Sequence, residues 1–164
     1  MIPHRLVTRT YRTMLQANSL YLAIYARDTP DDYHWALYYH GTADGGTKFH
    51  IRNLGQGWIA EHEQTNSIMK QFLLIGLMKF ASIRPDAVKA LHDTIVAVPY
   101  NAPGINCRTW VLDAIQAVMS AGLIHHFSLD QLETEAKVFG FNQFDAAVQN
   151  VQPRPVTTSV IYSQ

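Results

Sequence analysis

The spacing of hydrophobic positions changes along the chain, from mostly short β-prone runs in the first half to a helical period in the second. The first half has short apolar runs rich in β-branched and aromatic residues, separated by turn residues. These runs predict strands at 20–26, 33–39, 48–52, 58–62 and 72–80. The last run also fits a buried helix, because an unbroken apolar run does not separate the two structures.

In the second half, apolar residues recur three and four positions apart. This spacing predicts helices over 85–96, over 107–121, and from 129 to Gly140 or beyond. Asn106 is placed as an N-cap, Gly122 as a helix stop, and Ser128 with Gln131 forms a capping-box pattern. Strands followed by helices indicate an α+β fold, with an antiparallel sheet packed on helices.

Length and composition predict one domain, at residues 19–150. The chain has 164 residues, 48% of them hydrophobic and 16% charged, which is ordinary globular composition and enough for a core. Residues 1–18 form a basic leader that we expect to pack on the domain; an organelle targeting segment stays open, because the first 27 residues contain no Asp or Glu. Residues 151–164 contain two prolines and are expected to be extended or disordered.

Charge and cysteine content narrow the functional classes. Thirteen basic residues balance thirteen acidic ones without a Lys/Arg cluster, so a nucleic-acid partner is not expected. No run approaches the ~20 apolar residues of a membrane span. A single cysteine cannot form an internal disulfide, which favours a reducing, cytoplasmic location. The sequence leaves the oligomeric state open.

The residues of greatest chemical interest are Cys107 and His34. Cys107 opens a predicted helix, where unpaired backbone N–H groups and the helix dipole favour a thiolate. His34 lies on a predicted strand and shares one face with Tyr38 and His40. A histidine within reach of such a thiol can act as its base, which makes the cysteine a candidate nucleophile.

These motifs resemble those of a known superfamily. The strings His34-Trp-Ala-Leu-Tyr38 and Asn106-Cys107-x-x-Trp110-Val111, with His50 between them, are similar to the circularly permuted papain-like proteins. That group includes NlpC-type hydrolases, lecithin:retinol acyltransferase-like enzymes and PPPDE-type isopeptidases, and the string Asn-Cys-Arg-Thr-Trp-Val is also similar to one in small fungal proteins. The resemblance covers about half of the chain. It implies Cys107 as nucleophile, His34 as base, His50 as the residue that orients the base, and an oxyanion site near the Cys107 backbone N–H.

The identity of the orienting residue depends on a hairpin register. A turn centred on Asp44-Gly45-Gly46 would place His50 opposite His40 and leave His34 near Gln56. A longer, asymmetric loop would instead restore a pairing of His34 with His50, so both His50 and Gln56 remain candidates.

Further candidates for substrate or oxyanion binding are Tyr38, Tyr100 and Asn106. The strings Glu61-His62-Glu63 and His125-His126 lack additional ligands at metal-binding spacing, so no metal or other cofactor is expected.

The sequence therefore predicts a cysteine-dependent acyl-processing enzyme, a hydrolase or transferase that forms a thioester intermediate. Its substrate is an amide, ester or thioester of an acyl, peptide or small-molecule compound, and hydrolysis, transfer and biosynthetic cyclisation all stay open. The alternative is a non-catalytic binding domain that keeps the same fold.

Overall fold

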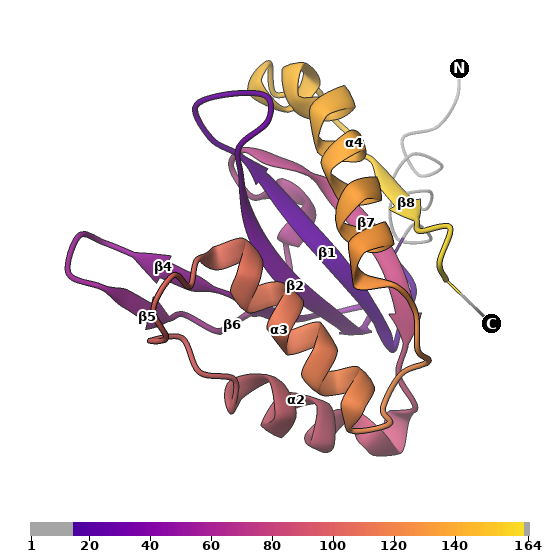
Figure 1. Cartoon of the computed structure of the whole chain (residues 1–164). Coiled ribbons are helices and arrows are strands. Elements are labelled where there is room, and N and C mark those ends of the chain that lie inside the picture. Colours follow the sequence, from indigo (N-terminus) through magenta and orange to yellow (C-terminus); the bar gives the residue numbers. More distant parts are fainter. Residues whose placement is uncertain (1–14, 163–164) are drawn as a thin grey trace, which may run out of the picture.

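The computed structural model describes residues 15–162 and confirms a mixed α+β architecture. Six strands form the main sheet in the order β6-β3-β2-β1-β7-β8, in which only β7 and β8 run parallel. Their bounds are β1 Ser19–Ala26, β2 Tyr33–Thr42, β3 Gly45–Phe49, β6 Glu63–Thr65, β7 Leu74–Ser82 and β8 Val156–Thr158. Two more strands, β4 Ile51–Asn53 and β5 Trp58–Ala60, form a separate hairpin that projects from the body of the protein (Figure 1).

Helices α2 (Val88–Val96), α3 (Cys107–Ser120) and α4 (Leu129–Val148) lie on one side of the sheet (Figure 1). Short 3₁₀ turns occur at η1 (Ile68–Lys70) and η2 (Pro85–Ala87). The predicted start of α3 is confirmed: the Asn106 side chain accepts from the Thr109 backbone N–H, and the Thr109 hydroxyl accepts from the Asn106 N–H. Gly122, with φ of +74°, follows the end of that helix. No helix within residues 15–162 is long and apolar enough to cross a membrane.

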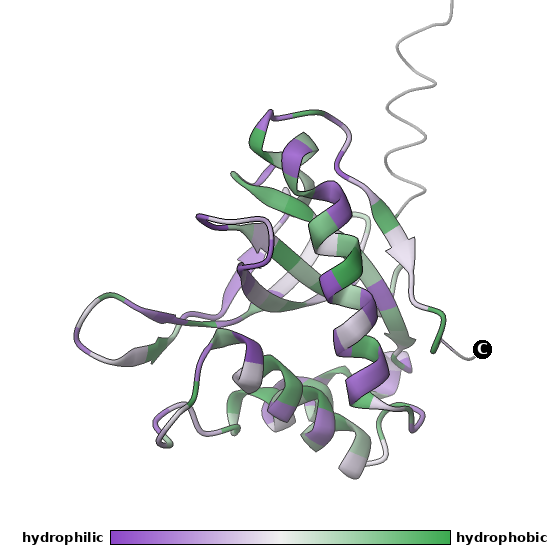
Figure 2. Ribbon diagram, turned by 45° about the horizontal axis from the view of Figure 1, so that its top comes forward, coloured by the Kyte–Doolittle hydropathy of each residue, from purple (hydrophilic) through white to green (hydrophobic). Residues whose placement is uncertain are grey.

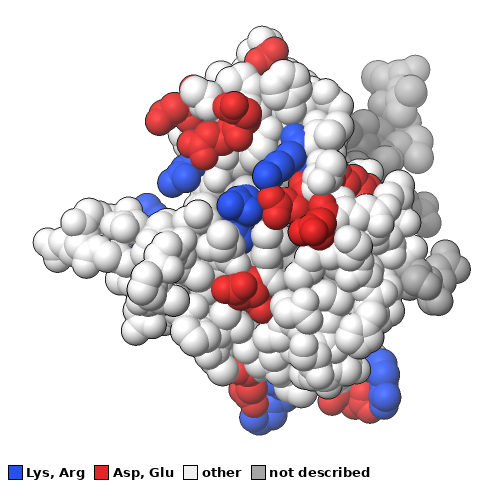
Figure 3. Space-filling view, viewed as in Figure 1, with Lys and Arg blue, Asp and Glu red and all other residues white. Residues whose placement is uncertain are grey.

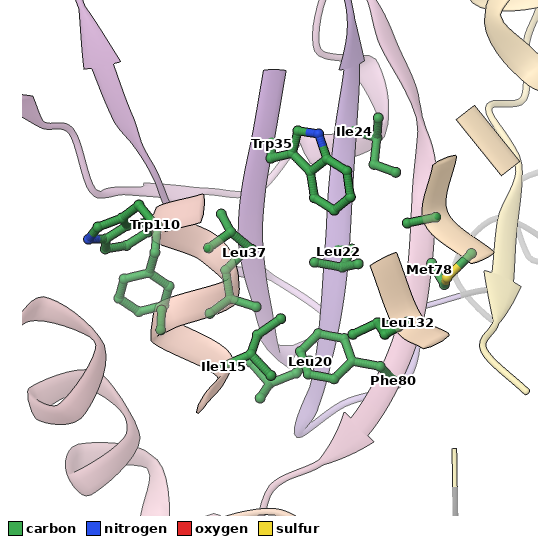
Figure 4. Close-up of a cluster of buried hydrophobic side chains, with 14 of the residues drawn as sticks. Leu20, Leu22, Ile24, Trp35, Leu37, Met78, Phe80, Trp110, Ile115 and Leu132 are labelled. Carbon is green, nitrogen blue, oxygen red and sulfur yellow. The ribbon is translucent and has the colours of Figure 1, made fainter. Parts of the chain in front are cut away.

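The main core lies between the sheet and helices α3 and α4. Alternate residues of β2, among them Trp35 and Leu37, point toward the helices. Leu37 lies near Trp110 and Ile115 of α3, and Trp35 lies beside Ile24 of β1 (Figure 4). The strands of the sheet are largely hydrophobic (Figure 2), because β1 and β7 are buried on both faces. Burial on both faces explains why the run at 72–80 lacks an alternating pattern, although it is a strand.

A second, smaller core covers the other face of the sheet. It contains Tyr21 and Tyr25 of β1, Ala36 and Tyr38 of β2, and Ile68 of η1. Successive residues of β2 therefore point to opposite faces of the sheet. Tyr33 and Trp35 face the helices, whereas His34 and Ala36 face away from them.

The C-terminal segment takes the extended one of its two expected states. Residues 151–162 are not disordered: they run extended, include β8, and bury the side chains of Arg154 and Ser159. The Arg154 guanidinium donates to the Leu74 carbonyl oxygen at 2.6 Å, which attaches this segment to the start of β7. Most of the predicted basic leader, residues 1–14, lies outside the described residues.

Candidate functional site

Two histidines and a glutamate from separate segments lie in a row. His34 Nε2 of β2 is 2.8 Å from His50 Nδ1, within hydrogen-bond distance. His50 Nε2 lies 3.3 Å from Glu61 Oε2, a close electrostatic contact that lacks the alignment of a hydrogen bond. A lone pair facing a carboxylate would be repelled, so His50 Nε2 carries the proton and His50 Nδ1 accepts the N–H of His34 Nε2. The row therefore leaves Nδ1 of His34 as the unprotonated nitrogen.

The register that forms this contact differs from the prediction. His40 pairs with Gly46 and Leu37 with Phe49, so the turn lies at residues 43–44, and the predicted turn centred on Asp44-Gly45-Gly46 is wrong. Both glycines belong to β3, where the neighbouring backbone leaves no room for a side chain. A Cβ would lie 1.8 Å from the Tyr39 carbonyl oxygen at Gly46, and 2.2 Å from the Thr65 carbonyl oxygen at Gly45.

The shifted register has two consequences for the candidate orienting residues. Pairing of β2 with β3 ends at Phe49, and the next residue, His50, is where the chain leaves the main sheet for the β4–β5 hairpin. Its side chain is buried there against His34, with the two ring centroids 5.0 Å apart. Gln56 lies in the exposed loop between β4 and β5 and does not line the site, so the predicted proximity of Gln56 to His34 is wrong.

Glu61 is a site residue that sequence analysis missed. Residue Ile51 pairs with Ala60 in the β4–β5 hairpin, and the Glu61 N–H donates to the His50 carbonyl oxygen at 2.9 Å. A hairpin centred on the string Leu54-Gly-Gln-Gly57 would have indicated this pairing from the sequence. Glu61 also accepts two hydrogen bonds from Arg52, at 2.9 and 3.2 Å.

Both histidines are neutral at pH 7. Burial, followed by the positive charges of Arg27, Lys48 and Arg52, lowers the pKa of His34 to about 4. Burial and the neighbouring Lys48, His34 and Arg52 lower the pKa of His50 to about 3. A neutral His34 can accept a proton, which is the state that a general base requires.

A groove of about 540 Å³ opens beside the histidines. Tyr25, His34, Lys48, His50, Glu61 and Gln71 are among the residues that line it. Trp58 and Phe72 add apolar surface, and the Phe72 side chain is 86% exposed. The groove therefore combines a polar, partly buried floor with an apolar rim.

Cys107 is the first residue of α3, as predicted, and its side chain is only 3% exposed. Its Sγ lies 3.9 Å from the carbonyl oxygen of Tyr33, the residue next to His34 in β2. The thiol packs with the core on the helix side of the sheet, whereas the His34 ring lies against Tyr25 of the opposite core, with centroids 5.9 Å apart. Within residues 15–162 no hydrogen bond joins Cys107 to His34. The structure brings His34 and His50 together and leaves the thiol beside the same strand, on its other side.

Three other predicted residues lie apart from the groove. Asn106 is engaged in capping α3. Tyr38 is fully buried, and its hydroxyl oxygen is 2.8 Å from His40 Nδ1. Tyr100 is partly exposed in the segment that precedes α3. Within residues 15–162 no cluster of three or more His, Cys, Asp or Glu side chains is placed to hold a metal ion.

The charged side chains form no large area of one sign on the face seen in Figure 3, where basic and acidic groups lie in small mixed clusters. Among the ion pairs of the described residues, Arg108 and Lys137 both contact Glu133, at 3.1 and 2.6 Å.

Comparison with known proteins gives one match. Residues 20–125 match a family described as "Family of unknown function (DUF6540)". No curated protein and no solved structure matches the chain. The matched segment runs from β1 through α3, so it contains the whole histidine row, the groove and Cys107. Because it covers more than half of the 164 residues, the chain belongs to the DUF6540 family.

Proposed function

We propose that this protein is a cysteine-dependent acyl-processing enzyme with a circularly permuted papain-like fold, in which Cys107 is the nucleophile and His34 the base. The observation that carries the proposal is the 2.8 Å contact between His34 Nε2 and His50 Nδ1. This contact orients the His34 ring and leaves Nδ1 as the nitrogen that we propose as the base, in keeping with the general arrangement of nucleophile, base and orienting residue.

The position of Cys107 at the start of a helix supports its proposed role as nucleophile. Cys107 lies at the N-terminus of a fourteen-residue helix, where the helix dipole stabilises negative charge on sulfur. Its Sγ contacts the backbone of Tyr33, and His34 is the next residue of the same strand. Catalytic hydrogen bonds are often long without substrate. Because Cys107 packs on the helix side of β2 and the His34 ring lies on the other side, the proposed active state requires a rearrangement that brings Sγ to Nδ1 of His34.

The reaction has two stages. First, the Cys107 thiol passes its proton to His34 as sulfur attacks the carbonyl carbon; the bond to the leaving group breaks, and the imidazolium returns that proton to the leaving group. A thioester on Cys107 results. Second, His34 deprotonates water, which attacks the thioester; the carboxylic acid is released and the thiol regains its proton from His34. Another nucleophilic acceptor in place of water gives acyl transfer.

An acylation assay tests this proposal without knowledge of the natural substrate. Purified protein is mixed with p-nitrophenyl acetate, and p-nitrophenol release and the mass of the intact protein are followed together. We expect one acetyl group on the wild-type protein, located on Cys107 by peptide mapping, and none at that position in Cys107→Ala. General-base catalysis contributes about 10²- to 10⁴-fold, so His34→Ala should slow acylation by at least about 100-fold.

The orienting residues give a graded outcome. His50→Ala should slow acylation less than His34→Ala, because His50 aligns the base without contacting the substrate. Gln56→Ala is the matched control: its exposed loop position predicts wild-type rates. Circular dichroism verifies the fold of each variant. Absence of acetylation in the wild type, or equal p-nitrophenol release by Cys107→Ala, would contradict covalent catalysis and favour the non-catalytic binding domain.

A further inference from the structure

Two hydrogen-bond donors fix the orientation of the Gln71 side-chain amide. Its Oε1 accepts one hydrogen bond from the Tyr25 hydroxyl and another, at 3.1 Å, from Lys48 Nζ. Burial raises the pKa of Tyr25, so this phenol keeps its proton and donates it. A protonated lysine also only donates. Two donors therefore assign the oxygen of the amide, and Nε2 points away from both of them.

This arrangement leaves the Gln71 NH₂ group as a positioned donor in the groove. Within residues 15–162, its Nε2 makes no hydrogen bond to the protein, while Gln71 lines the groove that contains His34. Lys48 is 8% exposed and also contacts Glu63 Oε1 at 3.0 Å, so it holds the amide in place and is itself already paired. An acceptor oxygen of a ligand is the group that would complete the hydrogen bonding of the amide.

The charges around the groove indicate what kind of oxygen this is. Arg27, Lys48 and Arg52 line it against two carboxylates, Glu61 and Glu63, so the basic groups exceed the acidic ones by one. Lys48 and Arg52 contact those glutamates at 3.0 and 2.9 Å. Arg27 has only a 3.8 Å contact with Asp32, and both of these side chains are about half exposed. One loosely paired guanidinium suits a ligand with a single negative charge better than a doubly charged phosphate.

We propose that the groove binds compounds bearing a carboxylate, with one carboxylate oxygen accepting from the Gln71 amide and the charge balanced by Arg27. This inference rests on the proposed function for one point, that the bound compound is a substrate. In that case the acyl compound has a carboxylate that is separate from its reacting carbonyl. Trp58 and Phe72 supply contacts for the apolar part of such a compound.

A binding experiment tests the carboxylate separately from catalysis. The probes are monomethyl succinate and its neutral amide, methyl succinamate, titrated by isothermal calorimetry into the Cys107→Ala protein so that neither is turned over. The two differ in the carboxylate alone. We expect monomethyl succinate to bind at least tenfold more tightly, with a preference that decreases as salt is added.

Variants localise the preference. Gln71→Glu keeps the shape of the side chain but replaces the donor with a repelling oxygen, and Arg27→Gln removes the charge; each should reduce the preference at least fivefold. Arg84→Gln removes an equal charge at an exposed site outside the groove and should retain the preference. Equal binding of the two probes, binding of neither, tighter binding of inorganic phosphate, or an unchanged preference in Gln71→Glu would overturn the inference. Carboxylate binding without acetylation of Cys107 would instead count against the proposed function alone.

Discussion

Mild acid should destabilise this protein through the buried histidine pair. The pKa of His34 is about 4 in the folded protein, with burial as the main cause, and returns to about 6.5 when the chain unfolds. Between these two values the unfolded state binds a proton that the folded state does not, so stability falls as the pH decreases from 6.5 toward 4. While this holds, each pH unit costs about 1.4 kcal/mol. A change from pH 7 to pH 5 therefore costs about 2 kcal/mol for His34.

His50 titrates in the same direction, because its pKa is lowered to about 3. The two rings share a hydrogen bond, so their contributions are not independent, and about 2 kcal/mol for the pair is the smaller expected loss. Burial also lowers the pKa of His40 and His62, which adds to the acid sensitivity of the whole protein. The test must therefore isolate the pair from this background.

The assay is urea unfolding followed by circular dichroism at pH 7 and pH 5, for the wild type and for His34→Gln/His50→Gln. Each protein is compared with itself at the two pH values, so a general loss of stability in the variant cancels. We expect the wild type to lose about 2 kcal/mol more than the variant between pH 7 and pH 5. Equal losses, within about 0.5 kcal/mol, would refute the assignment of a neutral, buried pair.

Three further predictions address packing, capping and activity. Gly46→Ala should cost more than 3 kcal/mol in urea unfolding, or prevent folding, because its Cβ would lie 1.8 Å from the Tyr39 carbonyl oxygen; Gly55→Ala, with nothing within 4 Å of its Cβ, should cost only about 1 kcal/mol for its positive φ. Asn106→Ala should cost about 1 kcal/mol through loss of the α3 cap and Asn106→Ser should restore most of it, whereas an acylation defect that Asn106→Ser does not repair would point to a chemical role instead. The acidic limb of the acylation rate should lie below pH 6 in the wild type, because the pKa of His34 is lowered to about 4, and a limb near pH 6.5 in a rate–pH profile would contradict a buried base.

Local signals predicted the secondary structure well. Asn106 and Gly122 mark the start and end of α3 because capping depends on residues within one turn. The run at 72–80 could not be assigned from its pattern, since its burial on both faces depends on tertiary packing, against the helices on one face and within the second core on the other.

The candidate site was predicted less completely, because its geometry depends on contacts between distant segments. His34 and His50 were identified by residue type, but their contact required the register that Gly45 and Gly46 set through close approach to Tyr39 and Thr65. Glu61 reaches the site through the β4–β5 hairpin, whose turn the string Leu54-Gly-Gln-Gly57 indicates, whereas Gln71 comes from a distant segment and has no local signal. The side of β2 on which Cys107 packs depends likewise on tertiary contacts.

Strand β8 also covers part of one edge of the long strand β7. Without β8, the nine-residue strand β7, which is almost wholly apolar, would offer unpaired N–H and C=O groups along one edge of the sheet. An open, flat and hydrophobic edge of this kind is a template for aggregation. The family match ends at residue 125, before α4 and β8. A recombinant fragment cut at that boundary would expose the edge of β7 and the part of the main core that α4 covers, so the segment through Thr158 belongs to the smallest unit expected to stay monodisperse.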